Sequence, residues 1–180
     1  MPDKKNNIET EIRSFITSKQ HRELLRFFKR NGKFLGEENQ VTYYFSGAKD
    51  LRIQKTNGSA KLWLKGGKIH ENHREDIVVR CDGGDFGNLE TLLLRLGYNP
   101  EIRWFRKRNN FFWRGISVAV DFTRGYGHIL ELEKMGGPKD GKKNRQLLLA
   151  KLKELGVKLT PKEEFAKKFS YYKKNWRKLV

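Results

Sequence analysis

The stretch Ile8-Glu-Thr-Glu-Ile-Arg-Ser-Phe15 alternates polar and apolar side chains over most of its length. Successive side chains of a β-strand point to opposite faces, so the stretch predicts a strand with Glu9, Glu11 and Arg13 on one face and the two isoleucines on the other. Such a strand needs apolar cover on one side and a polar environment on the other.

A second stretch near the other end of the chain has the same alternation. Residues 127–134 contain Ile-Leu-Glu-Leu-Glu, which places Glu131 and Glu133 on one face of a strand. Further β-rich runs, separated by short turn sequences, cover residues 41–45, 51–55, 60–65, 69–81, 102–113 and 116–123. We therefore expect about eight strands, joined mostly by hairpins into an antiparallel sheet.

Helical spacing and capping signals mark residues 18–31, 85–97, 140–155 and 161–176. If these helices cover the apolar faces from outside, the charged faces line a polar lumen, which is favourable only when a highly charged ligand occupies it. The expected fold class is therefore α+β. We predict a closed eight-stranded antiparallel β-barrel with helices packed outside, in a single domain of residues 1–180 whose residues 161–180 form a basic C-terminal helix or tail.

The composition restricts the class of partner. The 180 residues include 39 Lys and Arg against 21 Asp and Glu, a formal net charge of +18, which fits phosphate-rich small molecules, nucleic acid or anionic membrane surfaces. The single cysteine, Cys81, excludes an internal disulfide and a Cys-based zinc site. No apolar run approaches the roughly 20 residues that cross a bilayer. We expect a cytoplasmic protein without a membrane partner, and leave its state open between monomer and homodimer.

The two Glu-x-Glu pairs are candidates for metal binding. Two acids at positions i and i+2 of a strand lie roughly 7 Å apart on one face and repel each other unless a cation is near. Oxygen ligands suit Mg²⁺ or Mn²⁺ better than zinc or copper. A single pair usually marks a solvated strand face, but two pairs together favour a metal site.

Basic residues follow the same strand geometry and lie mostly between apolar neighbours. They are Arg13, Arg52, Lys65, Arg74, Arg106 and Arg108. A triphosphate carries about four negative charges at neutral pH, so its recognition needs several Arg and Lys side chains together with a metal ion, and a guanidinium group can contact phosphate through two hydrogen bonds. Acids and bases sorted by strand face therefore favour a triphosphate ligand over surface decoration for solubility.

The segment Glu9-Thr-Glu11-Ile-Arg13 resembles the Glu-x-Glu-x-Lys signature of the CYTH family, named for bacterial class IV adenylate cyclases and thiamine triphosphatase. Arg replaces the usual Lys. Further matches follow in order: Gln40 to Phe45, Leu51-Arg52-Ile53, Leu64-Lys65-Gly66, Arg74-Glu75, Arg106-Lys107-Arg108, Asp121 and Gly125 to Glu133, the last resembling the family's Gly-x-Phe-x-Glu-x-Glu strand. The resemblance covers residues 8–172 and depends on the order and spacing of these short motifs.

The resemblance implies a triphosphate tunnel metalloenzyme that requires Mg²⁺ or Mn²⁺. By position, the metal residues would be Glu9, Glu11, Asp121, Glu131 and Glu133. The triphosphate-binding residues would be Arg13, Arg52, Lys65, Arg74, Arg106 and Arg108, and the catalytic ones Glu9, Glu11 and Arg106. Because Arg13 stays protonated at neutral pH, it keeps a phosphate-binding role but not that of a base. The family also has a Lys on a C-terminal helix, and the candidates here are Lys167, Lys168, Lys173 and Lys174.

Two other patterns point to phosphate or nucleic acid less directly. Residues 136–143 match Gly-x-x-x-x-Gly-Lys, but a lysine stands where a P-loop has its metal-binding Ser or Thr, and a basic turn explains the segment better. Trp63, Trp104 and Trp113 alternate with basic residues, as in platforms that stack single-stranded bases, although packing in the interior is the commoner role.

Three functions remain. The first is a metal-dependent hydrolase of inorganic triphosphate, a nucleoside triphosphate or thiamine triphosphate, in which a metal-held water attacks the terminal phosphorus. The second is a class IV-type adenylate cyclase that makes cyclic AMP from ATP, with Tyr43, Tyr44 and Phe45 as candidates for adenine binding. The third is a non-catalytic module that binds RNA or polyphosphate, with an affinity that depends steeply on salt but not on the four glutamates.

Overall fold

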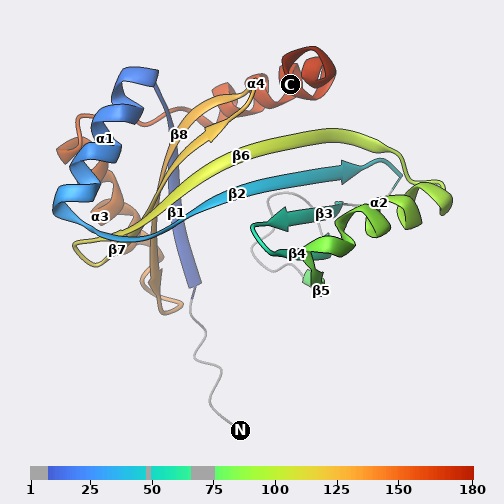
Figure 1. The fold of residues 1–180 in the computed structure, drawn as a ribbon. Helices are drawn as coiled ribbons and strands as arrows, with labels where there is room; N and C mark the ends of the chain where they lie inside the picture. Colours follow the sequence, from blue (N-terminus) through green and yellow to red (C-terminus); the bar gives the residue numbers. More distant parts are fainter. Residues whose placement is uncertain (1–7, 48–49, 66–75) are drawn as a thin grey trace, which may run out of the picture. The chain divides into compact units, whose positions relative to one another are not determined.

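A computed structural model describes residues 8–47, 50–65 and 76–180 of the chain. The elements follow one another in this order: β1 (Ile8–Ile16), α1 (Ser18–Asn31), β2 (Lys33–Phe45), β3 (Leu51–Thr56), β4 (Ser59–Lys65), β5 (Asp76–Asp82), a 3₁₀ turn (Gly83–Asp85), α2 (Phe86–Arg95), β6 (Pro100–Trp113), β7 (Ile116–Thr123), β8 (Gly127–Gly136), α3 (Gly141–Glu154) and α4 (Lys162–Leu179) (Figure 1). Helices follow the first and fifth strands, as the sequence predicts. None of the helices in this described part is long and apolar enough to cross a bilayer.

The strands form one eight-stranded sheet in the order β1-β8-β7-β6-β2-β3-β4-β5. The α+β class and the antiparallel pairing are confirmed, but the prediction of a closed barrel is wrong, because β1 and β5 end the order and no pairing joins them within the described residues. Alternation and hairpin turns determine which strands are neighbours. A barrel closes only if the two end strands of the sheet, here β1 and β5, pair with each other at a particular stagger. No local sequence pattern specifies that pairing. The enclosed polar lumen inferred from the pattern is therefore also wrong.

One strand boundary differs clearly from the expected one. Strand β2 begins at Lys33, well before the predicted start at residue 41, although the apolar pattern is weak there, and it is a neighbour of the long strand β6 in the sheet. Strand β5 spans Asp76–Asp82, and the first part of the predicted run 69–81 lies outside the described residues. Arg74, a predicted phosphate-binding residue, lies outside the described residues.

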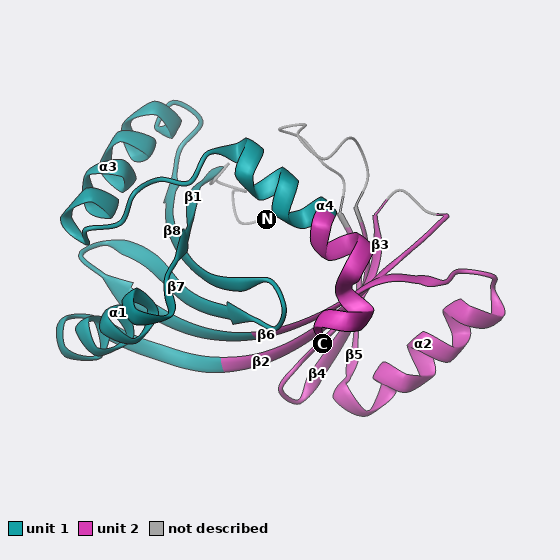
Figure 2. Ribbon diagram, turned by 90° about the horizontal axis from the view of Figure 1, so that it is seen from above, with its two compact units in different colours: residues 1–37, 107–170 teal, residues 38–106, 171–180 magenta. Residues whose placement is uncertain are grey.

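The chain divides into two compact units (Figure 2). Unit 1 consists of residues 1–37 and 107–170, and unit 2 consists of residues 38–106 and 171–180. In unit 1, α1 packs against β7 and β8, and α3 against β1 and β8. The buried side chains of this core include Ile12, Ile16, Leu24, Phe28, Val118, Val120, Leu130, Leu132, Leu148 and Leu152. They come from one face of each strand, so the opposite face of these strands is left for polar groups.

Helix α1 is amphipathic and begins with a capping box. The Thr17 hydroxyl accepts a hydrogen bond from the Gln20 backbone N–H at 3.1 Å, and the Gln20 side chain accepts one from the Thr17 backbone N–H at 2.9 Å. The cap is thus Thr17, the residue just before the predicted helix of residues 18–31. This helix start fixes the turn that follows β1.

Unit 2 has its own core, in which α2 covers β3 and β4. Its buried side chains include Tyr43, Phe45, Leu51, Ile53 and Leu93. The last part of α4 attaches to β6 through two buried polar contacts: the Tyr172 hydroxyl donates to the carbonyl of Arg103 at 2.7 Å, and the Trp176 indole donates to that of Glu101 at 2.8 Å. The basic C-terminal segment is therefore a docked helix in this part.

Candidate functional site

The two glutamate-containing stretches lie side by side in unit 1, because β1 pairs with β8. Glu11 is opposite Glu133, and Arg13 is opposite Glu131. Residues directly opposite each other in an antiparallel pair have side chains on the same face. Strand β7 adds Asp121, which is opposite Ile129 and therefore on this face as well. We call this surface the polar face of unit 1; it brings the acids of β1 and β8 together, with Ile129 of β8 also on this face.

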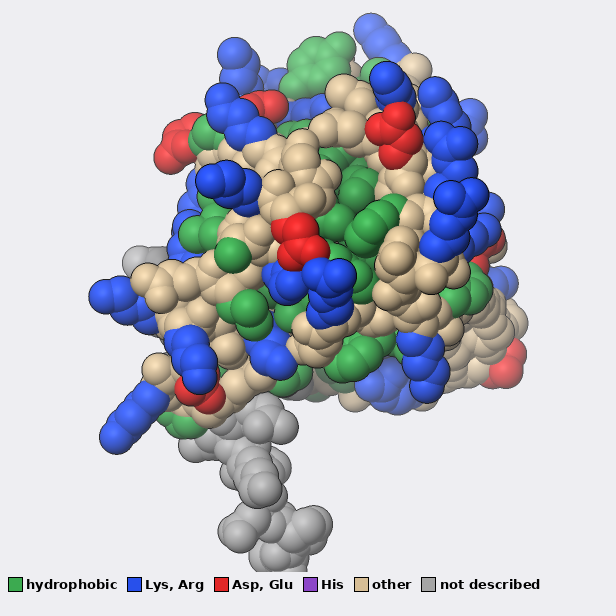
Figure 3. Space-filling model, turned by 90° about the vertical axis from the view of Figure 1, so that its left-hand side faces the viewer, with side chains coloured by type: hydrophobic (Ala, Val, Ile, Leu, Met, Phe, Trp, Pro, Cys, Tyr) green, Lys and Arg blue, Asp and Glu red, His purple; other side chains and the backbone are tan. Residues whose placement is uncertain are grey.

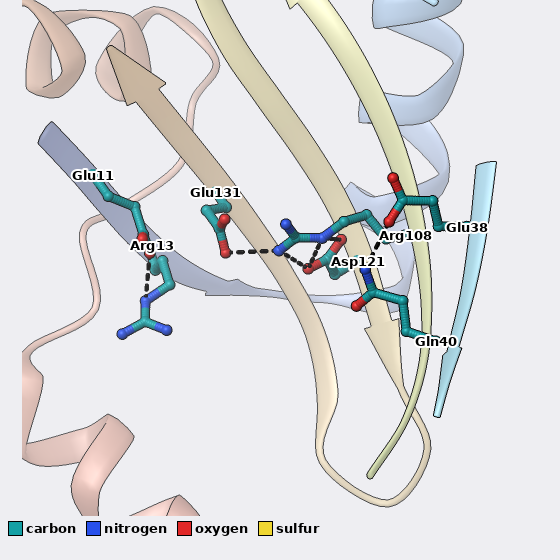
Figure 4. A network of polar contacts seen from close by, with 7 residues as sticks. All are labelled: Glu11, Arg13, Glu38, Gln40, Arg108, Asp121 and Glu131. Atoms are coloured by element: carbon teal, nitrogen blue, oxygen red, sulfur yellow. Dashed lines mark hydrogen bonds and ion pairs between the residues drawn. The ribbon is translucent and has the colours of Figure 1, made fainter. Parts of the chain in front are cut away.

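Arg108 of β6 lies at the centre of the polar face (Figure 4). Its Nε donates to both carboxylate oxygens of Asp121 at 3.1 Å, and its Nη2 donates to Asp121 Oδ2 at 2.8 Å and to Glu131 Oε2 at 2.9 Å. The side chains of Asp121, Glu131 and Arg108 are only 2%, 14% and 19% exposed. Burial alone would lower the pKa of Arg108, but the two carboxylates outweigh it and raise that pKa. The guanidinium is thus permanently charged and held by two acids.

A second ion pair joins Arg13 Nε to Glu11 Oε1 at 2.8 Å, in a more open position where the two side chains are 55% and 31% exposed. Burial, and then the charge of Glu131, raise the pKa of Glu11 to about 7, although Arg13 and Arg108 act in the opposite direction. Burial, followed by the charges of Glu9 and Glu131, also raises the pKa of Glu133. The polar face therefore holds more carboxylate charge than its own arginines neutralise.

These carboxylates suit a divalent cation. All the candidate donors are oxygens, which Mg²⁺ and Mn²⁺ prefer, and a cation would favour the ionised forms of Glu11 and Glu133, whose pKa values are raised first by burial and then by neighbouring acids. Among residues 8–47, 50–65 and 76–180, however, no three His, Cys, Asp or Glu side chains are grouped closely enough to hold a metal ion. Side-chain rearrangement is thus needed before several acids can share one ion.

Lys168 of α4 lies next to residues of the polar face of unit 1. Its Nζ lies 4.1 Å from the ring centre of Phe15 and 5.7 Å from that of Tyr126, and burial lowers its pKa. Phe15 has the same strand parity as Glu11 and Arg13 and therefore belongs to the polar face. Sequence reasoning left four lysines open on this helix, of which Lys173 instead forms an ion pair with Glu101 in unit 2.

The spacing of residues along α4 distinguishes Lys168 from the other candidate lysines. Lys168 stands four residues before the buried Tyr172 and eight before the buried Trp176, and therefore lies on the same face of the helix as these two side chains. The other candidate lysines are exposed.

The remaining predicted phosphate-binding residues belong to unit 2. Arg52 pairs with Asp50, its Nη2 lying 2.7 Å from Asp50 Oδ2, and its guanidinium lies 4.4 Å from the ring centre of Tyr44 and 5.0 Å from that of Trp63. Arg106 lies 5.8 Å from the ring centre of Trp104. Lys65 ends β4. The structure thus groups the acids with Arg13 and Arg108 in unit 1, and places Arg52, Lys65 and Arg106 in the other unit.

The remaining sequence patterns are structural. Trp104 and Trp113 are buried, which confirms packing rather than an exposed stacking platform for these two residues. In the segment that resembles a P-loop, the Gly137 backbone N–H donates to the Asp140 carboxylate at 2.8 Å, so the protein's own acid occupies this donor. Figure 3 shows many Lys and Arg side chains on one face of the molecule, with hydrophobic side chains between them.

The profile of the CYTH domain matches residues 7–165 of the sequence. The chain belongs to the CYTH family. The match includes every strand that contributes to the polar face. No curated protein is similar enough in sequence to this CYTH protein to count as a relative.

Solved structures share the fold of this CYTH protein. A conserved hypothetical protein from Pyrococcus furiosus is 25% identical, with a TM-score of 0.65 over 83% of this chain and 91% of its own. A candidate adenylate cyclase from Vibrio parahaemolyticus is 17% identical, with a TM-score of 0.63 over 88% and 98% of the two chains. A candidate adenylyl cyclase from Hippeastrum, described as having a dominant triphosphatase activity, is 19% identical, with a TM-score of 0.61 over 84% and 88%.

Proposed function

We propose that this CYTH protein is a metal-dependent triphosphatase whose catalytic carboxylates are those of the polar face, with inorganic triphosphate as the first substrate to test. The observation that carries the proposal is the excess of carboxylate charge beside Arg13 and Arg108 on one strand face. Acids that repel each other next to guanidinium groups suit a ligand that brings both a divalent cation and phosphate oxygens. The triphosphatase activity described for the Hippeastrum protein agrees with this choice.

In this proposal Glu9, Glu11, Glu131 and Glu133 hold Mg²⁺ or Mn²⁺, with Asp121 next to them. When bound, the ion neutralises phosphate oxygens and makes a water more acidic. Without the ion, burial and then the charge of Glu131 raise the pKa of Glu11 to about 7, and a bound ion would favour the ionised form of this carboxyl. Its register opposite Glu133 supports its assignment to the proposed metal residues.

The basic residues bind the phosphates. Arg13 and Arg108 present guanidinium groups on the polar face, and Lys168 adds an ammonium group whose pKa is lowered by burial. The proposal extends phosphate binding to the other predicted residues, Arg52, Lys65, Arg74 and Arg106. A guanidinium fork matches two phosphate oxygens, so such contacts orient the terminal phosphate as well as neutralise it.

The cyclase alternative gains less support. Of the aromatic residues considered for adenine, Tyr43 and Phe45 are buried in the core of unit 2, and Tyr44 packs against the Arg52 guanidinium. A cyclase needs a surface for the base as well as for the triphosphate. We therefore rank hydrolysis above cyclisation.

The test is a phosphate-release assay with tripolyphosphate, ATP and thiamine triphosphate, each with Mg²⁺ or Mn²⁺, and mass spectrometry for cyclic AMP. Replacing Glu131 by Gln should lower kcat by about 100-fold or more, because it removes a charge that the proposal places at the metal. Glu154 is the matched control. It lies on α3 of the same unit, paired with Arg114 and Lys151, and Glu154→Gln should keep kcat within about twofold.

Wild-type phosphate release no higher than that of Glu131→Gln would refute the triphosphatase. Cyclic AMP as the main product from ATP would assign the cyclase instead. Binding of RNA with steep salt dependence, unchanged by Glu131→Gln and without turnover of any triphosphate, would assign the non-catalytic module.

A further inference from the structure

Arg108 is a cation that the protein supplies to its own acidic site. Its guanidinium contacts both oxygens of Asp121 and one oxygen of Glu131. Asp121 is almost fully buried, whereas Glu131 and Arg108 keep some exposed surface. The bond to Glu131 is therefore the more accessible of the two, while the bonds to Asp121 anchor the guanidinium from the buried side.

The position of Arg108 conflicts with the proposed use of Glu131. A divalent cation bound at this carboxylate would lie close to a guanidinium that donates to it, and like charges in a partly buried site repel strongly. The absence of any ready-made group of three acids within the described residues agrees with this conflict. Binding of a metal at Glu131 thus requires that Arg108 release the carboxylate.

A triphosphate gives Arg108 a replacement partner. Its oxygens carry negative charge in the geometry that guanidinium groups bind best. We propose that Arg108 exchanges Glu131 for a phosphate oxygen when triphosphate binds, while Asp121 keeps hold of the same guanidinium. Glu131 then becomes free for the metal ion. This inference rests on the proposed function and adds an order of binding. Bound triphosphate takes Arg108 away from Glu131, which makes that carboxylate available to the metal ion, so the two ligands bind cooperatively.

Glu131 and Glu133 provide a matched pair of variants for the first test. Both glutamates lie on the same face of β8, and each substitution by Gln removes one carboxylate. Of the two, Glu131 is the one that accepts a hydrogen bond from Arg108. Tripolyphosphate binding is measured by calorimetry in EDTA, without metal or turnover. Glu131→Gln leaves Arg108 free of one partner, so affinity should rise by about tenfold, whereas Glu133→Gln should raise it by about twofold through net charge alone.

A second measurement follows the metal ion without any triphosphate. Mn²⁺ binding is measured by electron paramagnetic resonance for the wild type, Arg108→Gln and Arg13→Gln. Both variants remove one guanidinium from the polar face, but Arg13 pairs with Glu11 rather than with Glu131. Arg108→Gln should strengthen Mn²⁺ binding by about tenfold and Arg13→Gln by clearly less. Circular dichroism checks that the variants are folded.

Equal effects of Glu131→Gln and Glu133→Gln on tripolyphosphate affinity would overturn the exchange, because only net charge would then matter. Weaker affinity in Glu131→Gln would overturn it as well. If the wild type hydrolyses tripolyphosphate and the two variants nevertheless behave alike, the triphosphatase stands and the exchange fails. If the wild type neither binds nor hydrolyses tripolyphosphate, both fail.

Discussion

At the scale of single residues, the protonation of Glu11 should be coupled to metal binding. Its pKa of about 7 comes first from burial and then from the charge of Glu131. An acid whose pKa is higher in the folded state than in the unfolded one stabilises the folded protein at low pH. That contribution is lost as the pH rises from about 4.5 to about 7, because the folded state then has to give up a proton that the unfolded state has already released.

Metal binding should reverse this dependence. A metal at the polar face favours the ionised form of Glu11, so Mn²⁺ affinity should be about tenfold weaker at pH 6 than at pH 8 if one proton is released. Calorimetry in buffers of different ionisation enthalpy measures both the affinity and the proton release. Glu11→Gln should flatten the profile, and an affinity that does not change over this pH range in the wild type would contradict the role of Glu11.

The same scale shows which site residues a sequence reveals. Glu11, Arg13 and Glu131 could be placed on one face because strand alternation is a local rule, and pairing of β1 with β8 then brought them together. Arg108 could be named but not its partners, because its contacts with Asp121 and Glu131 join three different strands. For Lys168 the sequence held only a spacing signal relative to Tyr172 and Trp176, because the docking of α4 is described by no short motif.

At the scale of elements, the turn from β1 into α1 positions the acidic strand. The capping box at Thr17 satisfies backbone N–H groups that have no partner within the helix, and Leu24 and Phe28 of the same helix are buried in the core beneath the polar face. The helix was predictable to within one residue because its spacing and cap are local. The early start of β2 was not predictable, since it depends on a long neighbouring strand.

Thr17→Ala should lower the free energy of unfolding by about 1 kcal/mol, because the mutation removes the side-chain half of the capping box. Urea denaturation followed by circular dichroism measures the loss. Ser18→Ala is the control in the neighbouring position. The Ser18 hydroxyl accepts an exposed hydrogen bond from Arg22, so its loss should cost within about 0.5 kcal/mol. Equal losses in both variants would argue against a specific cap.

At the scale of the whole molecule, the sequence predicted the α+β class and the antiparallel hairpin neighbours, but it did not predict that β6 lies next to β2 or that the sheet stays open within the described part of the chain. Hairpins and alternation predicted antiparallel neighbours, which the structure confirms. A charged strand face looks the same in a sequence whether it lines a lumen or lies on an open sheet. The charge of the polar face therefore remained informative about the ligand although the inferred barrel was wrong.

A ligand that binds only the folded chain stabilises it. Tripolyphosphate with Mg²⁺ at about 100 times its Kd should add about 2.7 kcal/mol, which corresponds to a rise in Tm of about 5–10 °C. Thermal melts with and without Mg²⁺ measure the effect, and the part of the rise that depends on Mg²⁺ should be clearly smaller in Glu131→Gln. Sulfate at equal ionic strength controls for general anion binding to a chain of net charge +18, and a rise as large with sulfate would contradict a specific site.

The pairing of β1 with β8 also has a consequence for biosynthesis. Strand β1 is translated before β8, the partner that completes its ladder, and strands β2 to β7 lie between the two in the chain. Until β8 has been made, Ile12 and Ile16 lack part of the core that later buries them, and the acids of the two strands cannot meet. A chain that ends before β8 would be unable to form the polar face, and its unpaired β1 would be exposed to proteases.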